Sequence, residues 1–201
     1  MRAASRHSLG ADVIDDSILI QRSLAGDSSA FGELVERYQG RLCNTLFHLV
    51  GGREEAEDVM QEAFVQAYVK LASFEGKSAF FTWLYRIAFN LSVSRKRRKR
   101  PEISVDSYRE ALGIDPEDGS EDPAEDLMRR ERAAQLYQAL DRLSEEHRAI
   151  LVLREIEGCC YDTIGEILDL AAGTVRSRLH RARSHLRDQL EEILHESTPD
   201  N

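Results

Sequence analysis

The sequence lacks several features on which common protein classes depend. Its 201 residues include only three cysteines, Cys43, Cys159 and Cys160. They are too few and wrongly spaced for a zinc site or a disulfide framework, and adjacent cysteines rarely form a bridge. We therefore expect no metal ion and no structural disulfide, and a reducing cytoplasm as the compartment.

Long apolar runs are also absent. No stretch approaches the roughly 20 apolar residues of a transmembrane helix, and the N-terminus has no signal-peptide core, so we expect neither membrane insertion nor export. The alternation that marks β-strands is missing as well, whereas apolar residues recur at spacings of three and four in most segments. Because 42% of the residues are hydrophobic, the chain can form real cores, and we expect an all-α fold.

Capping residues and glycines delimit the expected helices. The first begins near residues 15–16 and stops at Gly26, and the second is capped by Asp27 or Ser28 and ends at Gly51. Further helices are expected at 53–74, 80–100, 127–143 and 144–158, followed by a pair within 161–190.

The net charge of −9 is unevenly divided along the chain. Residues 1–100 carry fifteen Lys and Arg against twelve Asp and Glu, residues 101–126 carry one against ten, and residues 127–201 carry eleven against fourteen. An acidic segment with many turn residues predicts a flexible linker. The expected organisation is a disordered N-terminus (1–12), a helical domain (13–100), the linker (101–126), a second helical domain (127–195) and a tail (196–201).

The segment 161–190 predicts two helices joined by a tight turn. On the second helix, apolar residues recur at helical spacing; they are Val175, Leu179, Ala182, Leu186 and Leu190. The opposite face is basic, and no acid occurs between Thr174 and Arg187. Gly165 is typical of a first helix that crosses the second closely, since a large side chain would not fit there.

Such a pair is typical of a helix-turn-helix whose second helix enters the DNA major groove. We expect Thr174, Arg176, Ser177 and Arg178 near base edges and Arg181 and Arg183 near phosphates. The pattern leaves one alternative open, a structural helix with a solvated basic face.

The helix expected at 53–74 begins with a cluster of acids. Five carboxylates fall within nine residues, namely Glu54, Glu55, Glu57, Asp58 and Glu62. Acids near a helix N-terminus stabilise the helix by about 0.3 to 1 kcal/mol each. The cluster therefore has two interpretations, helix stabilisation or an acidic docking surface for a basic partner.

The segment 80–100 combines aromatic residues with a basic end. The aromatics fall on more than one helix face; they are Phe80, Phe81, Trp83, Tyr85 and Phe89. Stacking on an aromatic side chain contributes about 1 to 3 kcal/mol per unpaired base, and cations follow the phosphates. The segment therefore predicts either a surface that holds separated DNA strands or an aromatic core with a solvated basic tail.

Four motifs in this order resemble the extracytoplasmic-function (ECF) sigma factors of bacteria. They are DVMQEAFVQAY (58–68), FTWLYRIAFN (81–90), LSEEHRAILVLREIEG (143–158) and GTVRSRLHRAR (173–183). The resemblance implies sigma region 2 and sigma region 4 as the two domains. It also implies a protein without cofactor or catalysis, which recruits RNA polymerase core through the β and β′ subunits and directs it to promoter DNA. The sequence leaves open whether an anti-sigma factor or some other device controls it.

The resemblance assigns roles to individual residues. Binding of core polymerase falls to Asp58, Gln61, Glu62 and Phe64. Recognition and melting of the minus-10 element fall to Trp83, Tyr85, Arg86, Asn90, Ser94, Arg95, Arg97 and Arg98, with Asn90 in a base-reading position. Recognition of the minus-35 element falls to Thr163, Gly173, Thr174, Arg176, Ser177, Arg178, His180, Arg181 and Arg183.

Three positions depart from the family pattern. Cys160 and Thr163 stand where many members have Ser and Glu, and Ala171 is a poor cap for the recognition helix. We expect the caps to be weaker by about 1 kcal/mol. The promoter sequence is therefore not transferable from the family.

Two other classes of function remain open. A helix-turn-helix repressor or a response-regulator output domain would explain residues 127–201 but would leave 80–100 and the acidic helix without a role. An enzyme would need Cys159, Cys160, His180 or His185 as nucleophile or ligand. The spacing of these residues forms no triad, metal set or phosphate loop.

Overall fold

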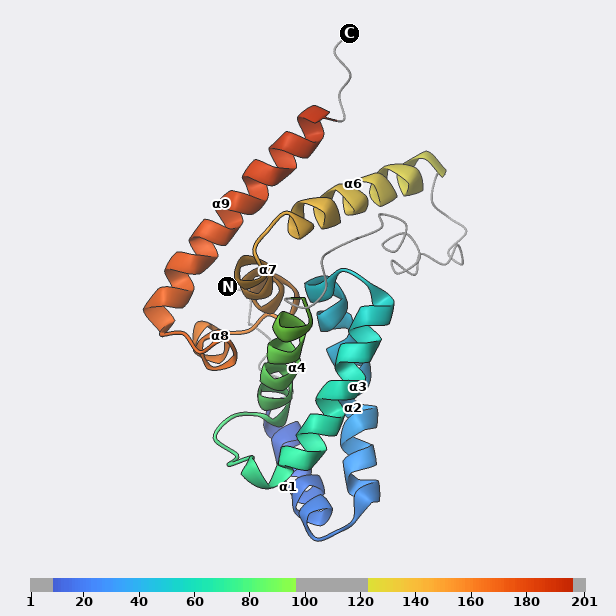
Figure 1. The fold of residues 1–201 in the computed structure, drawn as a ribbon, viewed down its shortest axis with the longest axis vertical. Helices are drawn as coiled ribbons and strands as arrows, with labels where there is room; N and C mark the ends of the chain where they lie inside the picture. Colours follow the sequence, from blue (N-terminus) through green and yellow to red (C-terminus); the bar gives the residue numbers. More distant parts are fainter. Residues whose placement is uncertain (1–8, 97–122, 197–201) are drawn as a thin grey trace, which may run out of the picture.

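The computed structural model describes residues 9–96 and 123–196, and all regular structure within them is helical, as expected (Figure 1). The first group of helices is α1 (Leu9–Leu24), α2 (Ser28–Val50), α3 (Arg53–Lys70), the 3₁₀ turn η1 (Leu71–Ser73) and α4 (Phe80–Lys96). The second group is α6 (Pro123–Asp141), α7 (Glu145–Leu151), the π-helical segment η2 (Val152–Ile156), α8 (Tyr161–Leu168) and α9 (Ala172–Glu196). None of the described helices is long and apolar enough to cross a membrane.

Most helix ends lie where capping residues predicted them. The Asp27 carboxylate accepts a hydrogen bond from the backbone N–H of Ser29 at 3.1 Å and caps α2. Helix α2 ends at Gly51, whose φ of 84° suits glycine, and Ser144 caps α7 through the backbone N–H of His147. Because these residues fix where α2 and α7 begin and where α2 ends, only short turns separate these helices from their neighbours along the chain.

Two helices begin earlier than expected. Helix α1 starts at Leu9, and Asp16 does not cap it: the Asp16 carboxylate is buried and accepts hydrogen bonds from Tyr38 at 2.5 Å and Arg37 at 2.7 Å. Helix α6 starts at Pro123, a residue whose fixed φ suits the first position of a helix. The expected extension of the fourth helix to residue 100 and the segment 101–122 lie outside the described residues.

The core of the first group forms where α2 packs between α1, α3 and α4 (Figure 1). Its buried side chains follow the helical spacing of each segment, as in Leu34, Leu42 and Leu46 of α2 and Leu84 and Ala88 of α4. Each buried Leu contributes about 1.5 to 3 kcal/mol to the stability of the fold. One side of α3 and one side of α4 remain in contact with solvent, and the candidate sites lie there.

The two groups of helices also contact each other, with α8 against α4 and with α7 and η2 against α2. The side chain of Glu157 is 6% exposed and accepts hydrogen bonds from Arg41, at 2.8 Å, and from Thr45. Arg148 is 1% exposed and donates to the backbone oxygen of Leu49 at 3.1 Å. These polar contacts hold the second group of helices against the end of α2.

Candidate nucleic-acid interface

The helix-turn-helix is formed by α8 and α9, with Asp169 in the turn between them. Asp169 adopts a left-handed conformation with a φ of 56°, and the next backbone N–H, that of Leu170, donates to the Gly165 oxygen at 2.9 Å. A Cβ on Gly165 would lie 2.5 Å from the Leu170 oxygen. The close approach inferred for Gly165 is therefore confirmed. The backbone of the turn is nearest to the position of a Cβ on Gly165, and the side chain of Val175 of α9 follows.

The core of this motif matches the apolar pattern of the sequence. Ile164 and Ile167 of α8 are buried against Val175, Leu179 and Ala182 of α9. Leu168 of α8 and Leu170 of the turn are half-buried at its edge. Because these residues occupy one side of α9, the arginines are left on the other side.

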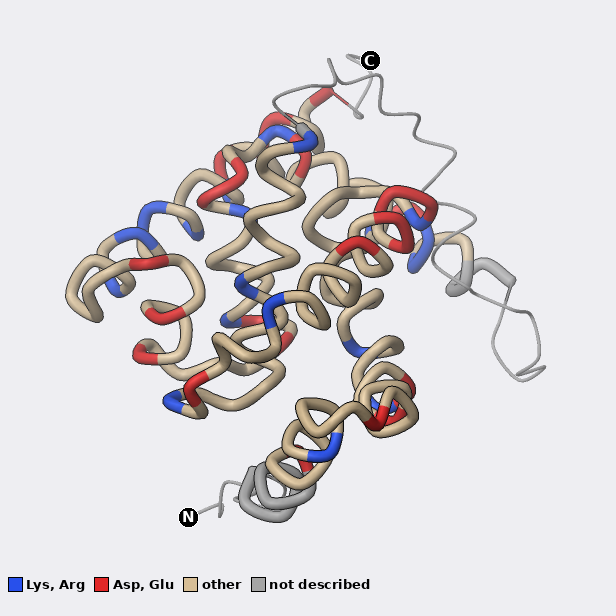
Figure 2. Tube along the Cα trace, turned by 60° about the horizontal axis from the view of Figure 1, so that its bottom comes forward, with Lys and Arg blue, Asp and Glu red and all other residues tan. Residues whose placement is uncertain are grey.

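The arginines of α9 differ in their surroundings. Arg176 and Arg181 are exposed, whereas Arg178 forms an ion pair with Glu146 of α7 at 2.5 Å. Arg183 pairs with Glu155 of η2, with Nη2 and Oε1 2.6 Å apart. Figure 2 shows that Lys and Arg are interspersed with Asp and Glu along the described helices. Exposed pairs of this kind contribute about 0 to 1 kcal/mol, so a DNA phosphate can displace the carboxylate.

The remaining residues predicted to contact the minus-35 element lie near the N-terminal ends of α8 and α9. Gly173, Thr174 and Ser177 occupy the first turns of α9, and His180 is exposed one turn further on. Thr163 is half-buried, and its Oγ1 lies 3.2 Å from the Sγ of Cys160, which occupies the cap position of α8 without a capping hydrogen bond. The weak cap expected for Cys160 is confirmed.

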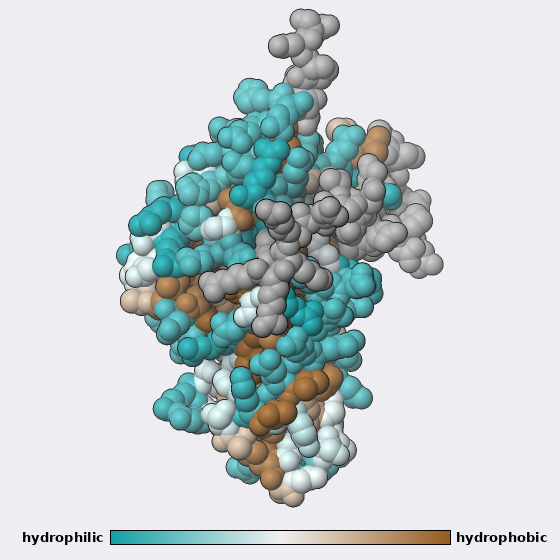
Figure 3. Space-filling view, in the orientation of Figure 1, coloured by the Kyte–Doolittle hydropathy of each residue, from teal (hydrophilic) through white to brown (hydrophobic). Residues whose placement is uncertain are grey.

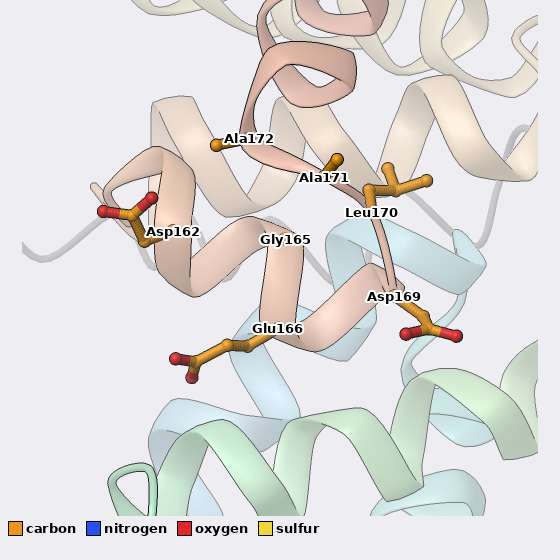
Figure 4. Close-up of a pocket in the computed structure, with 7 residues that line it drawn as sticks. All are labelled: Asp162, Gly165, Glu166, Asp169, Leu170, Ala171 and Ala172. Carbon is orange, nitrogen blue, oxygen red and sulfur yellow. The ribbon is translucent and has the colours of Figure 1, made fainter.

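A hollow lies beside the turn of the helix-turn-helix (Figure 4). Its lining residues are Asp162, Gly165, Glu166, Asp169, Leu170, Ala171 and Ala172. The only charged side chains among them are carboxylates, so the hollow does not favour a phosphate. The cationic side of the motif is the outer face of α9.

Helix α4 presents a polar stripe to solvent. Arg86, Asn90 and Ser94 are exposed and lie four residues apart, so they follow one line along the helix. The sequence prediction places Tyr85 at this surface, but Tyr85 is fully buried and cannot stack on a base. Trp83 is half-buried, with its ring 5.2 Å from that of Phe74. The aromatic-core interpretation is thus correct for Tyr85, Phe80 and Phe81, while the polar stripe keeps the surface interpretation open.

Helix α3 presents the acidic residues next to this stripe. Asp58 and Gln61 are exposed and Glu62 is half-buried. Phe64 is 6% exposed and packs edge-on against Phe31, so it supports the helix from inside and offers no contact surface to a partner. Arg95 of α4 reaches back to both Asp58 and Glu62. Arg97 and Arg98 lie outside the described residues.

Sequence reasoning missed an apolar part of the α3 surface. Val65 is 64% exposed and Val69 is 76% exposed. Both share a helix face with Asp58 and Glu62, at spacings of three and four. Figure 3 shows brown areas low in the view, where Figure 1 places α1 and the end of α3. The signal was present in the sequence, because both valines lie off the inward stripe of the helix.

Comparisons with known proteins identify both halves of the chain. The model of Sigma-70 region 2 matches residues 34–102, and the model of Sigma-70 region 4 matches residues 133–186. The RNA polymerase sigma-H factor of Pseudomonas aeruginosa is 37% identical over 187 residues, which cover 90% of this chain and 97% of that protein. The ECF RNA polymerase sigma factor SigW of Bacillus subtilis is 34% identical over 186 residues, with coverage of 87% and 96%.

Two solved structures are also similar over most of the chain. The structure of CnrH in complex with the cytosolic domain of CnrY has a TM-score of 0.65 and 25% identity, and covers 89% of this chain and 98% of that chain. The sigma factor RpoE in complex with the anti-sigma factor NepR, from Bartonella quintana, has a TM-score of 0.58 and 25% identity, with coverage of 80% and 96%.

A helix-turn-helix domain alone would fit several classes of DNA-binding protein, but region 2 and region 4 in this order define a sigma factor. The chain belongs to the ECF sigma factors of RNA polymerase. It directs the polymerase to promoters, as the resemblance implied.

Proposed function

We propose that three separate surfaces carry out promoter recognition. The docking face of α3, formed by Asp58, Gln61, Glu62, Val65 and Val69, binds the clamp helices of the polymerase β′ subunit. The α4 stripe, formed by Arg86, Asn90 and Ser94, contacts unpaired bases of the minus-10 element. The outer face of α9 reads the minus-35 element. The observation that supports this division best is the α4 stripe, a line of exposed polar residues on a helix whose other side is core.

The chain itself performs no chemistry in this proposal. Polymerase core carries out nucleotidyl transfer, and the sigma factor supplies contacts to promoter DNA. Because the complex works on the chromosome, its place of action is the cytoplasm. An anti-sigma factor is a further partner that we propose, since the similar RpoE structure contains one.

Replacing Asn90 by Ala should change base preference in the minus-10 element and leave closed-complex formation nearly unchanged. Asn90 is exposed in the middle of the α4 stripe, and its amide can hydrogen-bond the Watson–Crick edge of a base only after the strands separate. Permanganate footprinting of the holoenzyme on a set of promoters with single minus-10 substitutions measures the base preference of opening, and a binding titration at a temperature too low for opening measures closed-complex formation.

The matched control for Asn90 is Asn44→Ala, the same substitution at an exposed position of α2. It should leave the footprint unchanged. An N90A holoenzyme that opens promoters with wild-type base preference would remove Asn90 from the proposed interface. If the wild-type holoenzyme gives no reactive thymines, the melting role of α4 is wrong.

Substitutions of two α9 arginines should separate base reading from phosphate binding. Arg176→Ala should relax discrimination at one base pair of the minus-35 element by about 1 to 3 kcal/mol. Arg183→Ala should weaken binding to all duplexes alike and reduce the slope of log K against log salt by about 0.9. Binding titrations of the holoenzyme at several salt concentrations, on duplexes with single minus-35 changes, measure both quantities.

Arg187→Ala serves as the control on the same helix. Arg187 is exposed and lies about one turn beyond Arg183, near the carboxylates of Asp188 and Glu191. Its substitution should change neither the discrimination nor the slope. Uniform weakening by R176A, without loss of discrimination, contradicts the base-reading role of Arg176.

A further inference from the structure

The last turn of α4 is tied to the docking face by one arginine. The Nη2 and Nε atoms of Arg95 donate to Oε2 of Glu62 at 2.8 and 3.1 Å, and Nη1 donates to Oδ2 of Asp58 at 3.3 Å. Asp58 and Glu62 lie one helical turn apart on α3, so one guanidinium bridges both carboxylates. The arginine is 29% exposed at its side chain, which places the bridge at the edge of the molecule.

This arrangement occupies two groups of atoms for which other partners are expected. Asp58 and Glu62 are the carboxylates that the docking face offers to polymerase. Arg95 is a cation expected at promoter phosphates. In the free chain each of these groups already has an oppositely charged neighbour, so an external partner competes with that neighbour for the same charge.

The bridge is not required to hold the two helices together. Helices α3 and α4 already pack through apolar side chains, among them Val59 and Ala63 of α3 and Leu84 and Ala88 of α4. The carboxylate side chains of Asp58 and Glu62 are 57% and 39% exposed, so water and an external cation can reach them. Ion pairs of this exposure are weak and are readily exchanged for others.

We propose that Arg95 and polymerase core compete for Asp58 and Glu62, and that core binding releases Arg95 to promoter phosphates. The inference rests on the proposed docking face. It couples two binding events that the proposed function treats as independent. By thermodynamic reciprocity, a factor by which core binding favours the Arg95–phosphate contact equals the factor by which that contact favours core binding.

The substitution Arg95→Ala has effects of opposite sign on the two partners. Core polymerase should bind the full-length variant more tightly, by about threefold to fivefold, because no internal cation has to be displaced. The holoenzyme should bind promoter DNA less tightly, with a slope of log K against log salt reduced by about 0.9. The free chain should show an unchanged slope on the same DNA, since its Arg95 is held by the carboxylates.

Arg53→Ala is the matched control for core binding. Arg53 forms an ion pair with Glu57 at 3.0 Å on the same helix, so R53A removes the same charge and frees a carboxylate outside the docking face. Its affinity for core should stay at the wild-type value. Thermal unfolding of both variants, followed by circular dichroism, should match the wild-type transition closely enough to show that the helices are intact.

The outcomes separate this inference from the proposed function. Equal or weaker core binding by R95A overturns the competition, and an equal gain by R53A overturns it too, because the gain then reflects net charge. An unchanged salt slope in the R95A holoenzyme overturns the release of Arg95. The docking face itself is tested by reversing the charges of Asp58 and Glu62. If that variant binds core with wild-type affinity, the proposed docking face is wrong, whatever the result for R95A.

Discussion

Reversing both charges on the docking face, in the variant D58R/E62R, should weaken assembly with core polymerase by at least about 100-fold. Both carboxylates face solvent on one side of α3, where basic residues of the polymerase clamp would meet two like charges. Fluorescence titration of labelled variant with core polymerase measures the affinity. The variant also loses the ion pairs with Arg95. Because exposed pairs contribute about 1 kcal/mol or less, the free energy of unfolding should fall by no more than that amount.

The control for this reversal is E33R/E36R on α2. It makes the same change of net charge, and it also separates an arginine from its carboxylate, because Glu33 pairs with Arg22 at 3.2 Å. Core binding by the control should remain within a small factor of wild type. Wild-type affinity of D58R/E62R would show that polymerase docks elsewhere.

Gly165→Val should unfold the helix-turn-helix before the rest of the chain. The Cβ alone would lie 2.5 Å from the backbone oxygen of Leu170, and that oxygen belongs to a turn that cannot retreat without breaking the Leu170 to Gly165 hydrogen bond. We expect a loss of about 3 kcal/mol in the free energy of unfolding of the second domain. Urea unfolding followed by circular dichroism measures this loss, and binding to minus-35 duplexes should fall with it.

A valine at Gly40 provides the comparison for Gly165. Gly40 lies inside α2, and a Cβ there would meet no atom within 4 Å. Because valine has a higher helix propensity than glycine, G40V should leave the free energy of unfolding unchanged or raise it by about 0.4 kcal/mol. Equal unfolding curves for G165V and wild type would contradict the tight turn.

The parts of the fold that follow local rules were predictable from the sequence. The caps at Asp27 and Ser144 and the buried side of α9 depend on residues within one or two turns of each other. The role of Gly165 was also predictable, since a helical glycine next to a tight turn has a steric reason to be there.

The parts that depend on distant residues were not predictable in the same way. Asp16 looked like a helix cap, but it is hydrogen-bonded by Tyr38 from the next helix. Tyr85 lies among aromatics on several helix faces, so periodicity alone did not assign it to the core. The partners of Arg95 lie more than thirty positions away along the chain, and no local pattern marks them.

The spacing of promoter elements sets a limit on the packing of the two domains. Arg86 of the α4 stripe and Asp169 of the helix-turn-helix lie 4.0 Å apart, whereas minus-10 and minus-35 elements are separated by about 25 base pairs, or about 85 Å of duplex. With the roles proposed for α4 and α9, a chain that keeps this contact cannot span both elements, so we expect the Glu157 and Arg148 contacts to break on the promoter. The apparent promoter affinity is then the affinity of the chains whose domains have separated, multiplied by the fraction of chains in that state. Residues that never touch DNA would in this way set the strength of transcription.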